Sequence, residues 1–475
     1  MLRRVPFLVM LLLFSMQAFA GTGRIIILNL DSANVGLNDP TPAAPVGGNA
    51  GTTLGQQRLN VYLAAAEKWQ NVIDTNVDIR VRASFAPISG CTDTEGVLGQ
   101  ASPIDWAFNF DNAPKPNVWY PIALANKFAN RDLLPTADDI NVRFNSSVDN
   151  ATCLGATNWY YGLDGNHGIH QDLFVVVLHE LGHGLGIAGA GGTPNFRDNL
   201  PAIADTHTFD LTTGLRWDQM TLEQRQVSQL NTGNLVWDGA AVRGAAGTFL
   251  KATTALAVSS PSPIAGSYDI GTAAFGPVAS SSNVAGRIAI AADEMNADGP
   301  TSTDGCTPFT NASSIAGRIA LIDRGSCTFV AKARNAQAAG AIGVVIADNT
   351  RTTCAPPGMA GVAPDVTIPI VSITQGDGDT LKTVLNAVNG TVQASLRLDP
   401  SQLAGTKQGY VRLYAPCTFE PGSSIRHWDT NADPDLLMEP SISSSLLHGL
   451  DLTLHQLLDL GWSLPPRTGR RVLKR

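Results

Sequence analysis

The sequence has few charged residues and no surplus of basic ones. Lys, Arg, Asp and Glu make up 15% of its 475 residues, and 40 acidic against 32 basic residues give a formal net charge of −8. Proteins that bind nucleic acid gain much of their affinity by neutralising phosphates, which requires clustered Lys and Arg. The composition therefore argues against nucleic acid as a partner.

Long apolar runs are scarce as well. One lies at the start of the chain, where Arg3 and Arg4 precede a stretch from Phe7 to Phe14, and Ala18-Phe19-Ala20 precedes Gly21. This pattern is typical of an export signal cleaved before Gly21, and no later stretch approaches the roughly 20 apolar residues of a membrane-spanning helix. We expect residues 1–20 to be a signal peptide. The mature chain is then secreted, extracellular or periplasmic, without a membrane span.

The sequence also lacks a CxxC pair, which argues against a cysteine metal site or a thioredoxin-like centre. Its cysteines are an even set in a chain predicted to be exported, and an oxidising compartment favours pairing them. Proximity in the sequence favours two of the pairs and leaves the third as the remainder. These pairs are Cys91–Cys153, Cys306–Cys327 and Cys354–Cys417.

Strand and helix patterns alternate in the first half of the chain. Residues 24–31 form a β-rich run, residues 59–73 have apolar side chains at helical spacing, and residues 77–85 and 140–144 alternate polar with apolar side chains. Period-two alternation predicts half-buried strands, and the order of the elements predicts an α+β fold with a mixed sheet. A further helix is expected from a cap at Asp172 to the glycines near residues 184–186.

That helix carries the strongest chemical signal in the sequence, His179-Glu180-Leu181-Gly182-His183. Positions i and i+4 of a helix lie on one face, so both imidazoles can reach one ion while Glu180 stands beside them. Two surface histidines with ordinary partners are the structural alternative. The pattern predicts a zinc site in which Glu180 is the general base.

A catalytic zinc commonly has three protein ligands, so a third must come from elsewhere. The candidates are His167 and His170 before the helix, and Asp205, His207, Glu223 and His427 after it. Glu223 lies in an amphipathic stretch, MTLEQRQVSQL, and would suit a His-His-Glu site. A solvent-exposed helix face explains the same stretch. The residue types alone leave these candidates open.

The run HELGHGLG, residues 179–186, resembles the start of the metzincin zinc peptidases. The compact form of that motif has a third histidine where this chain has Gly189. In the leishmanolysin-like branch the third histidine arrives later, in a Ser-x-x-His-Trp segment followed by a Met-turn, and residues 423–440, SSIRHWDTNADPDLLMEP, resemble that pair. The resemblance implies that His427 is the third zinc ligand and that Met438 is the Met-turn residue.

A second resemblance lies between the two parts of this motif. Residues 317–348 have the pattern of a strand, a tight turn, a helix capped by Thr328 and another strand, and a further strand is expected at residues 368–373. This βαβ pattern closely resembles the protease-associated (PA) domain. The resemblances together imply a metzincin-like zinc peptidase domain with a mixed sheet and an active-site helix, interrupted by a β-rich α/β PA domain. The expected order is signal peptide, residues 1–20; peptidase domain, 21–253; PA domain, 254–400; peptidase domain again, 401–475.

These features predict a secreted zinc metallopeptidase, most simply a metalloendopeptidase, that hydrolyses protein or peptide substrates. Zinc bound by imidazoles lowers the pKa of its water to about 7, and Glu180 would take the proton. The alternative from another class is an exported peptide-binding scaffold with a structural zinc site and a PA domain. Glu180 argues against that alternative, since a structural site has no use for a general base. The sequence indicates no oligomeric state.

Overall fold

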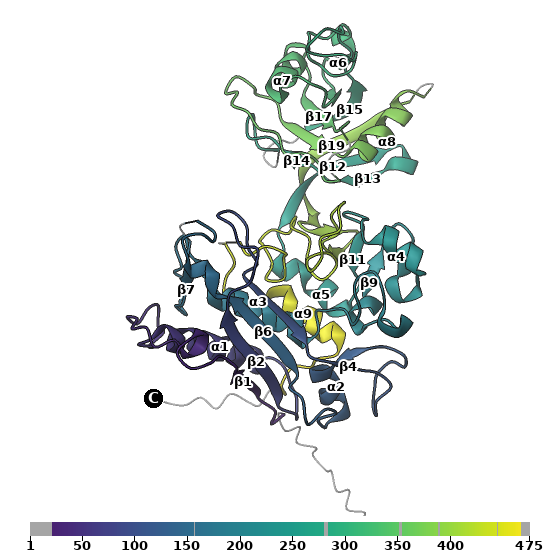
Figure 1. Cartoon of the computed structure of the whole chain (residues 1–475). Coiled ribbons are helices and arrows are strands. Elements are labelled where there is room, and N and C mark those ends of the chain that lie inside the picture. Colours follow the sequence, from purple (N-terminus) through teal and green to yellow (C-terminus); the bar gives the residue numbers. More distant parts are fainter. Residues whose placement is uncertain are drawn as a thin grey trace, which may run out of the picture. The chain divides into compact units, whose positions relative to one another are not determined.

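The computed structural model describes residues 21–155, 157–279, 284–350, 354–387, 390–443 and 445–466. The predicted signal peptide, residues 1–20, lies outside these ranges. The chain divides into two compact units. The first contains residues up to 186 together with those from 460 onward, and the second contains residues 187–459. Their helices and strands are labelled in Figure 1.

The first unit is built on a four-stranded mixed sheet in the order β1-β2-β6-β3. The first three strands are parallel, and β3 pairs antiparallel with β6 at the edge. The strands are β1 Ile25–Asn29, β2 Ile79–Ala86, β3 Gly99–Pro103 and β6 Ile140–Asn145. The strands expected at residues 24–31, 77–85 and 140–144 and the mixed sheet are confirmed, and β3 is an addition to them.

Helices α1 (Leu54–Gln70) and α3 (Leu173–Leu185) pack against each other beside this sheet. The indole N–H of Trp69 donates a hydrogen bond to the carbonyl of Leu178 at 3.1 Å and so fixes the two helices in register. The remaining elements are short. They are β4 Trp106–Ala107, β5 Tyr120–Pro121, α2 Ile122–Ala129, β7 Trp159–Tyr160 and β8 Gln171–Asp172.

The second unit contains a five-stranded antiparallel sheet in the order β10-β9-β11-β21-β20. Its central pair joins distant parts of the sequence, since Val236 of β11 lies opposite Arg412 of β21. The strands are β9 Thr208–Asp210, β10 Leu215–Arg216, β11 Leu235–Trp237, β20 Thr406–Lys407 and β21 Tyr410–Arg412. The helices of this part are α4 Leu222–Ser228, α5 Ala240–Phe249 and α9 Asp451–Leu460.

Between β11 and β21 the chain forms an eight-stranded sheet in the order β13-β12-β19-β15-β16-β17-β18-β14. The strands are β12 Ala252–Ser260, β13 Gly266–Tyr268, β14 Gly271–Thr272, β15 Val284–Ile290, β16 Ile319–Asp323, β17 Gly343–Ala347, β18 Ile370–Ile373 and β19 Val392–Leu403. The helices are α6 Ala312–Ile315, α7 Phe329–Ala338 and α8 Gln375–Leu385. The predicted strand, helix and strand within residues 317–348 are β16, α7 and β17, and the hydroxyl of Thr328 caps α7 as expected.

Apolar side chains fill both faces of this larger sheet. Ala320 and Ile322 of β16 belong to a core cluster that includes Ala333 of α7, whereas Ile319 and Leu321 belong to one on the other face. Alternate residues of a strand point to opposite faces, so a strand covered on both sides is apolar throughout. These two cores give the inserted sheet a hydrophobic interior of its own.

The three predicted disulfides are confirmed. Cys91 pairs with Cys153, Cys306 with Cys327 and Cys354 with Cys417, with Cα–Cα distances of 5.2, 5.7 and 5.6 Å. The third bond joins the loop that follows β17 to the segment that follows β21. It therefore links the inserted sheet covalently to the part of the chain that leads to His427.

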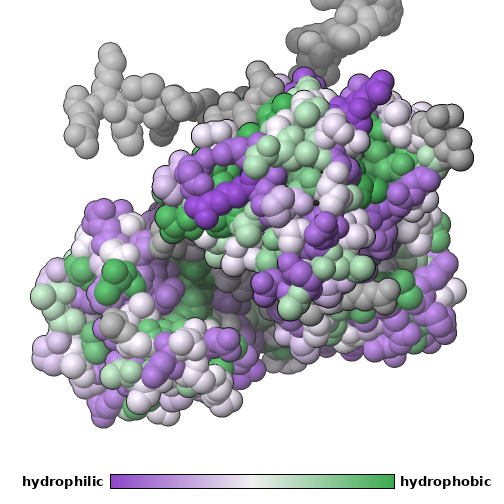
Figure 2. All heavy atoms as spheres, turned by 90° about the horizontal axis from the view of Figure 1, so that it is seen from above, coloured by the Kyte–Doolittle hydropathy of each residue, from purple (hydrophilic) through white to green (hydrophobic). Residues whose placement is uncertain are grey.

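In the described ranges no helix is both long and apolar enough to cross a membrane. On the face seen in Figure 2, hydrophobic residues lie scattered among hydrophilic ones. A single exposed apolar side chain such as Val362, which is 88% exposed, is normal for a folded surface.

A substitution at Gly184 would show how tightly α3 packs on the sheet. A Cβ atom at this position would lie 2.3 Å from the Cγ2 atom of Ile140 on β6. We expect Gly184→Ala to lower the free energy of unfolding by about 1–3 kcal/mol through overpacking. The matched control is Gly244→Ala in α5, where a Cβ would meet nothing within 4 Å. There the higher helix propensity of Ala should stabilise by up to about 1 kcal/mol. Chemical denaturation of both variants measures the contrast, and equal effects would contradict it.

The inserted sheet should fold by itself, because its ends meet. Strands β12 and β19 pair along their length, with Ala252 opposite Leu403. We expect a fragment of residues 252–403 carrying Cys354→Ser to unfold in one cooperative thermal transition, measured by circular dichroism. A fragment of residues 252–387 lacks β19, which pairs with both β12 and β15. This shorter control should not fold. If the shorter fragment unfolds cooperatively and the longer one does not, residues 252–403 are not the independent folding unit.

Candidate metal centre

Helix α3 begins and ends where its sequence dictates. The carboxylate of Asp172 accepts a hydrogen bond from the backbone N–H of Phe174 at 3.0 Å, and Gly186 ends the helix with a φ of 135°. Residues that have a side chain rarely adopt that backbone conformation, so glycine is required there. Most of the helix is buried, and the predicted helix is confirmed.

His179 and His183 lie one helical turn apart on α3, and their Nε2 atoms are 3.1 Å from each other. His179 is buried and His183 is half-buried. Two imidazole nitrogens bound tetrahedrally to one zinc ion at about 2.0–2.1 Å would lie about 3.3 Å apart. The spacing of this pair therefore fits two ligands of one zinc ion.

Glu180 is buried, with 6% of its surface exposed. Burial raises the pKa of its carboxyl to about 8, and a hydrogen bond with the backbone of Ala101 acts in the opposite direction. Ala101 belongs to β3, and a Cβ atom on Gly99 of the same strand would lie 3.1 Å from the Cγ atom of Glu180. Burial of the carboxyl therefore favours its protonated form over its charged form.

His427 is held by the backbone around it. Its carbonyl accepts a hydrogen bond from the N–H of Tyr414 at 2.9 Å, and its Nδ1 lies 2.7 Å from the carbonyl oxygen of Ser423. A carbonyl can only accept, so Nδ1 carries the proton and the neutral ring keeps a lone pair on Nε2. Metal-binding histidines are commonly oriented by such a bond from their other nitrogen.

Met438 lies directly behind this segment. Its side chain is fully buried, and its carbonyl accepts a hydrogen bond from the N–H of Trp428 at 2.7 Å. The residue that follows His427 is thus anchored on Met438. This contact gives Met438 a supporting position next to the candidate ligand.

The nitrogen atoms of three of the predicted residues come together. One ligand atom from each of His179, His183 and His427 lies within 4.8 Å of the other two, a group that could hold a metal ion. Three neutral imidazoles are a donor set that zinc commonly uses. Glu180 follows the first of these histidines on α3.

The other candidates for the third ligand are not part of this group. Glu223 is exposed on α4, and hydrogen bonds with its own backbone and with the side chain of Thr221 lower the pKa of its carboxyl. The ring of His207 stacks on that of Trp237 with 5.2 Å between their centroids. Each therefore has a local role.

His167 and His170 hold the loop before α3. The Nδ1 of His167 lies 2.8 Å from the carbonyl oxygen of His170, and the Nδ1 of His170 accepts a hydrogen bond from the N–H of Asn158 at 3.2 Å. These contacts shape a turn, and they explain the two histidines without a metal.

Asp205 binds the residue that precedes His427. Its carboxylate lies 2.5 Å from the guanidinium of Arg426, and both side chains are largely buried. Arg426 also packs over Gly189, where a Cβ atom would lie 2.7 Å from Nη2. Gly189 occupies the position of the third histidine in the compact motif, so the structure gives that glycine a steric reason. No local pattern in the sequence indicates this pair, because Asp205 and Arg426 lie far apart along the chain.

Two family models match parts of the chain. Residues 254–381 match the PA domain, and residues 48–239 match a family described as SPBPB7E8-like. The chain thus contains a PA domain, which corresponds to the larger sheet of the second unit, as the sequence predicted.

Several known proteins are similar to shorter stretches of the chain. ER degradation-enhancing alpha-mannosidase-like protein 3 of Xenopus laevis is 37% identical over 101 residues, which are 20% of this chain and 11% of that protein. An aminopeptidase of Pseudomonas aeruginosa (strain UCBPP-PA14) is 54% identical over 54 residues, 11% and 10% of the two chains. Vacuolar-sorting receptor 3 of Arabidopsis thaliana is 30% identical over 158 residues, 32% and 24%.

Solved structures show a likeness of similar extent. BSAP, a zinc aminopeptidase from Bacillus subtilis, is 24% identical with a TM-score of 0.23, and the match covers 32% of this chain and 31% of that chain. The chain thus spans a quarter or less of these curated relatives and about a third of this solved structure.

Proposed function

We propose that the chain is a secreted zinc-dependent metallopeptidase that hydrolyses peptide bonds. The observation that carries the proposal is the group of His179, His183 and His427, with the buried carboxyl of Glu180 next to the first of them. His179, His183 and His427 would hold zinc. When bound, zinc would polarise the scissile carbonyl and make a water molecule acidic enough to lose a proton near pH 7.

Glu180 would act as the general base. Its carboxyl directly follows the ligand His179 on α3, and the burial that raises its pKa favours uptake of a proton from the water. Its hydrogen bond with the backbone of Ala101 fixes the direction of the carboxyl group. The proton that Glu180 takes would pass to the leaving amine, which must be protonated before it can depart.

Strand β3 supports a peptide as the substrate. It is an edge strand, and the residue bonded to Glu180, Ala101, stands at its centre. An extended peptide can add to a free strand edge through backbone hydrogen bonds. A chain bound along β3 would extend to both sides of Glu180, which favours cleavage within a chain and thus a metalloendopeptidase.

The supporting residues agree with a metzincin-like arrangement of the leishmanolysin type. In that arrangement His427 is the late third ligand and Met438 lies under the metal. The hydrogen bond from the ring of His427 to the carbonyl of Ser423, and that from the N–H of Trp428 to the carbonyl of Met438, support both roles. The three disulfides are typical of an oxidising compartment and support export. An aminopeptidase of Pseudomonas aeruginosa and the minor extracellular protease Vpr of Bacillus subtilis are also similar to this chain over 10% and 15% of their lengths.

Glu180→Gln separates the base from the ligands. We expect this variant to keep one zinc per chain and to lose about 10²–10⁴-fold of its hydrolysis rate, because the amide cannot take a proton. Zinc content by atomic absorption and cleavage of an unfolded protein measure the two effects. A variant as active as the parent would end the proposed mechanism. A parent protein that binds zinc and hydrolyses nothing would favour the peptide-binding scaffold.

His427→Ala and Glu223→Ala decide the third ligand. Loss of His427 should weaken zinc binding by more than about 100-fold, since even residues that only support a ligand contribute 10–100-fold. Glu223→Ala should leave zinc affinity and activity unchanged, because that side chain is exposed on α4. Zinc titration against a competing chelator measures both. Normal affinity in the His427 variant with loss in the Glu223 variant would support the His-His-Glu alternative and refute this one.

A further inference from the structure

The residues from Gly21 onward are held by hydrogen bonds to the segment that precedes β2. The backbone nitrogen of Gly21 donates to the Oδ1 atom of Asp74 at 2.7 Å, and that of Gly23 donates to the carbonyl of Thr75 at 2.9 Å. The N–H of Arg24 then donates to the carboxylate of Asp78 at 2.9 Å. These bonds extend the pairing of β1 with β2 backward to Gly21. Chain ends usually fray unless such contacts hold them.

The place that Gly21 occupies has no room for a side chain. A Cβ atom there would lie 2.1 Å from the carbonyl oxygen of Thr75 and 2.7 Å from the carboxylate of Asp74. The backbone carbonyl cannot move aside cheaply, so only glycine fits. A carboxylate and a carbonyl are thus both within close reach of the Gly21 backbone, and both accept hydrogen bonds.

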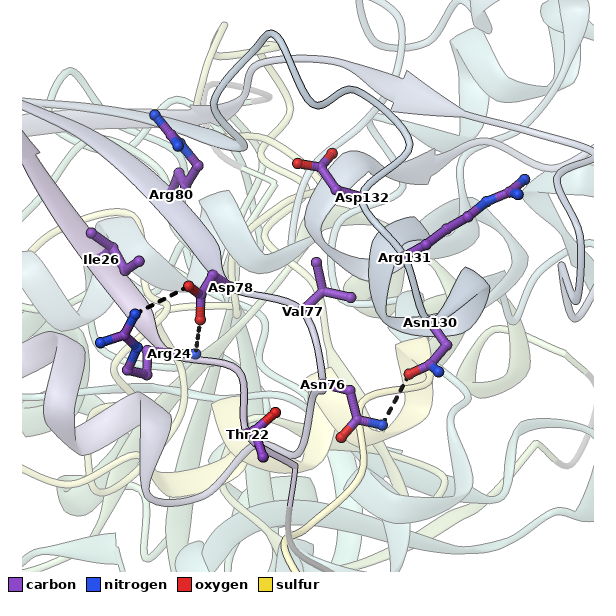
Figure 3. A pocket seen from close by; sticks show the side chains of 10 residues that line it. All are labelled: Thr22, Arg24, Ile26, Asn76, Val77, Asp78, Arg80, Asn130, Arg131 and Asp132. Carbon is purple, nitrogen blue, oxygen red and sulfur yellow. Dashed lines mark hydrogen bonds and ion pairs between the residues drawn. The ribbon is translucent and has the colours of Figure 1, made fainter.

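Two pairs of bonded polar side chains lie in the pocket beside this place. Figure 3 shows the adjoining pocket of about 740 Å³, in which Arg24 is paired with Asp78 and Asn76 is hydrogen-bonded to Asn130. Lys127, on α2, donates to the carbonyl of Gly461 at 2.8 Å. Burial lowers the pKa of Lys127, and Asp74 acts against that shift, so the charge of this lysine interacts with Asp74.

We propose that cleavage of the predicted leader before Gly21 creates a binding site for the new chain end, in which the α-ammonium group of Gly21 forms an ion pair with Asp74. The reaction that supplies this ligand is hydrolysis of the Ala20–Gly21 peptide bond, in which water gives a carboxylate on the leader and an ammonium on Gly21. The hydrogen bond from a neutral amide becomes one from a cation. Charge-assisted hydrogen bonds are roughly twice as strong as neutral ones.

The same contacts connect the new chain end to the helix of the metal centre. The N–H of Asp74 donates to the carbonyl of Ser463 at 2.7 Å, and the indole N–H of the neighbouring Trp462 donates to the carbonyl of Leu185 at 2.9 Å. Leu185 is the last residue of α3. An ion pair at Asp74 would therefore stabilise the segment whose hydrogen bonds lead through Ser463 and Trp462 to the end of α3.

The test compares two forms of the full mature chain, one that begins at Gly21 and one that carries a single additional alanine before it. In the first form the pKa of the α-amino group should lie about one unit above its ordinary 7.7–8.0. This shift corresponds to a tenfold smaller proton dissociation constant. A group whose pKa is raised by folding stabilises the fold below its unfolded pKa and loses that effect as the pH rises through the folded pKa. The form that begins at Gly21 should thus have the higher denaturation midpoint at pH 6.5, and the difference should vanish near pH 9.5.

Asp74→Asn is the control, since an amide oxygen can still accept the hydrogen bond but carries no charge. In this background the two forms should have the same denaturation midpoint, and the α-amino pKa should return to its ordinary value. The pKa, measured by NMR titration of ¹⁵N-labelled protein, can be read on the unmutated chain alone, so the test stands even if the variant folds poorly. An ordinary α-amino pKa in the form that begins at Gly21, or an equal gain in the Asp74→Asn background, would overturn the proposal. Neither measurement depends on zinc binding or hydrolysis.

Discussion

The pairing of β11 with β21 is the contact on which the second unit depends. Val236 and Trp237 of β11 lie opposite Arg412 and Val411 of β21, although the whole PA domain separates them in the sequence. The ladder continues where the N–H of Leu413 donates to the carbonyl of Leu235. The pairing fixes the register of β21 against β11, because a shift by one residue would turn every side chain to the other face. The register in turn fixes the position at which the segment after β21 begins. That segment carries His427.

An insertion of this size is tolerated because it begins and ends at one place. Strands β12 and β19 run side by side, so the chain leaves the smaller sheet and returns to it along one ribbon. The inserted sheet brings its own two apolar cores and therefore needs nothing from its host to bury its strands. Sequence distance between β11 and β21 thus adds little to the entropy cost of pairing them, since the loop between them is folded.

The sequence predicted the parts in which one pattern determines the structure. Helix α3 has a cap at Asp172, an apolar run and a glycine stop at Gly186, and each of these signals is local. The central strands β16, β17 and β18 of the PA domain are mostly apolar and almost wholly buried, as expected of strands covered on both faces. The cysteine pairing followed from order in the chain, and it is confirmed. The group of three histidines followed from a resemblance, because spacing alone left six candidates for the third position.

What the sequence did not predict has no local signal. Strand β3, Gly99 to Pro103, contains glycine and proline and is a strand only because β6 pairs with it. β-Propensity depends strongly on such neighbours. The ion pair between Asp205 and Arg426 and its fit over Gly189 are contacts between distant residues. Each becomes visible only when the chain is folded.

The disulfide between Cys354 and Cys417 changes what kind of joint the PA domain has with its host sheet. A ribbon of two strands alone can bend and twist about its length and so acts as a hinge. The disulfide adds a third attachment, away from β12 and β19 in the sequence, and it lies on the segment that leads from β21 to His427. Three points of attachment remove rotations that two allow. A force on the PA domain, such as that from a bound protein, could therefore not be relieved by rotation about the two-stranded ribbon. It would be transmitted to the backbone that leads to His427.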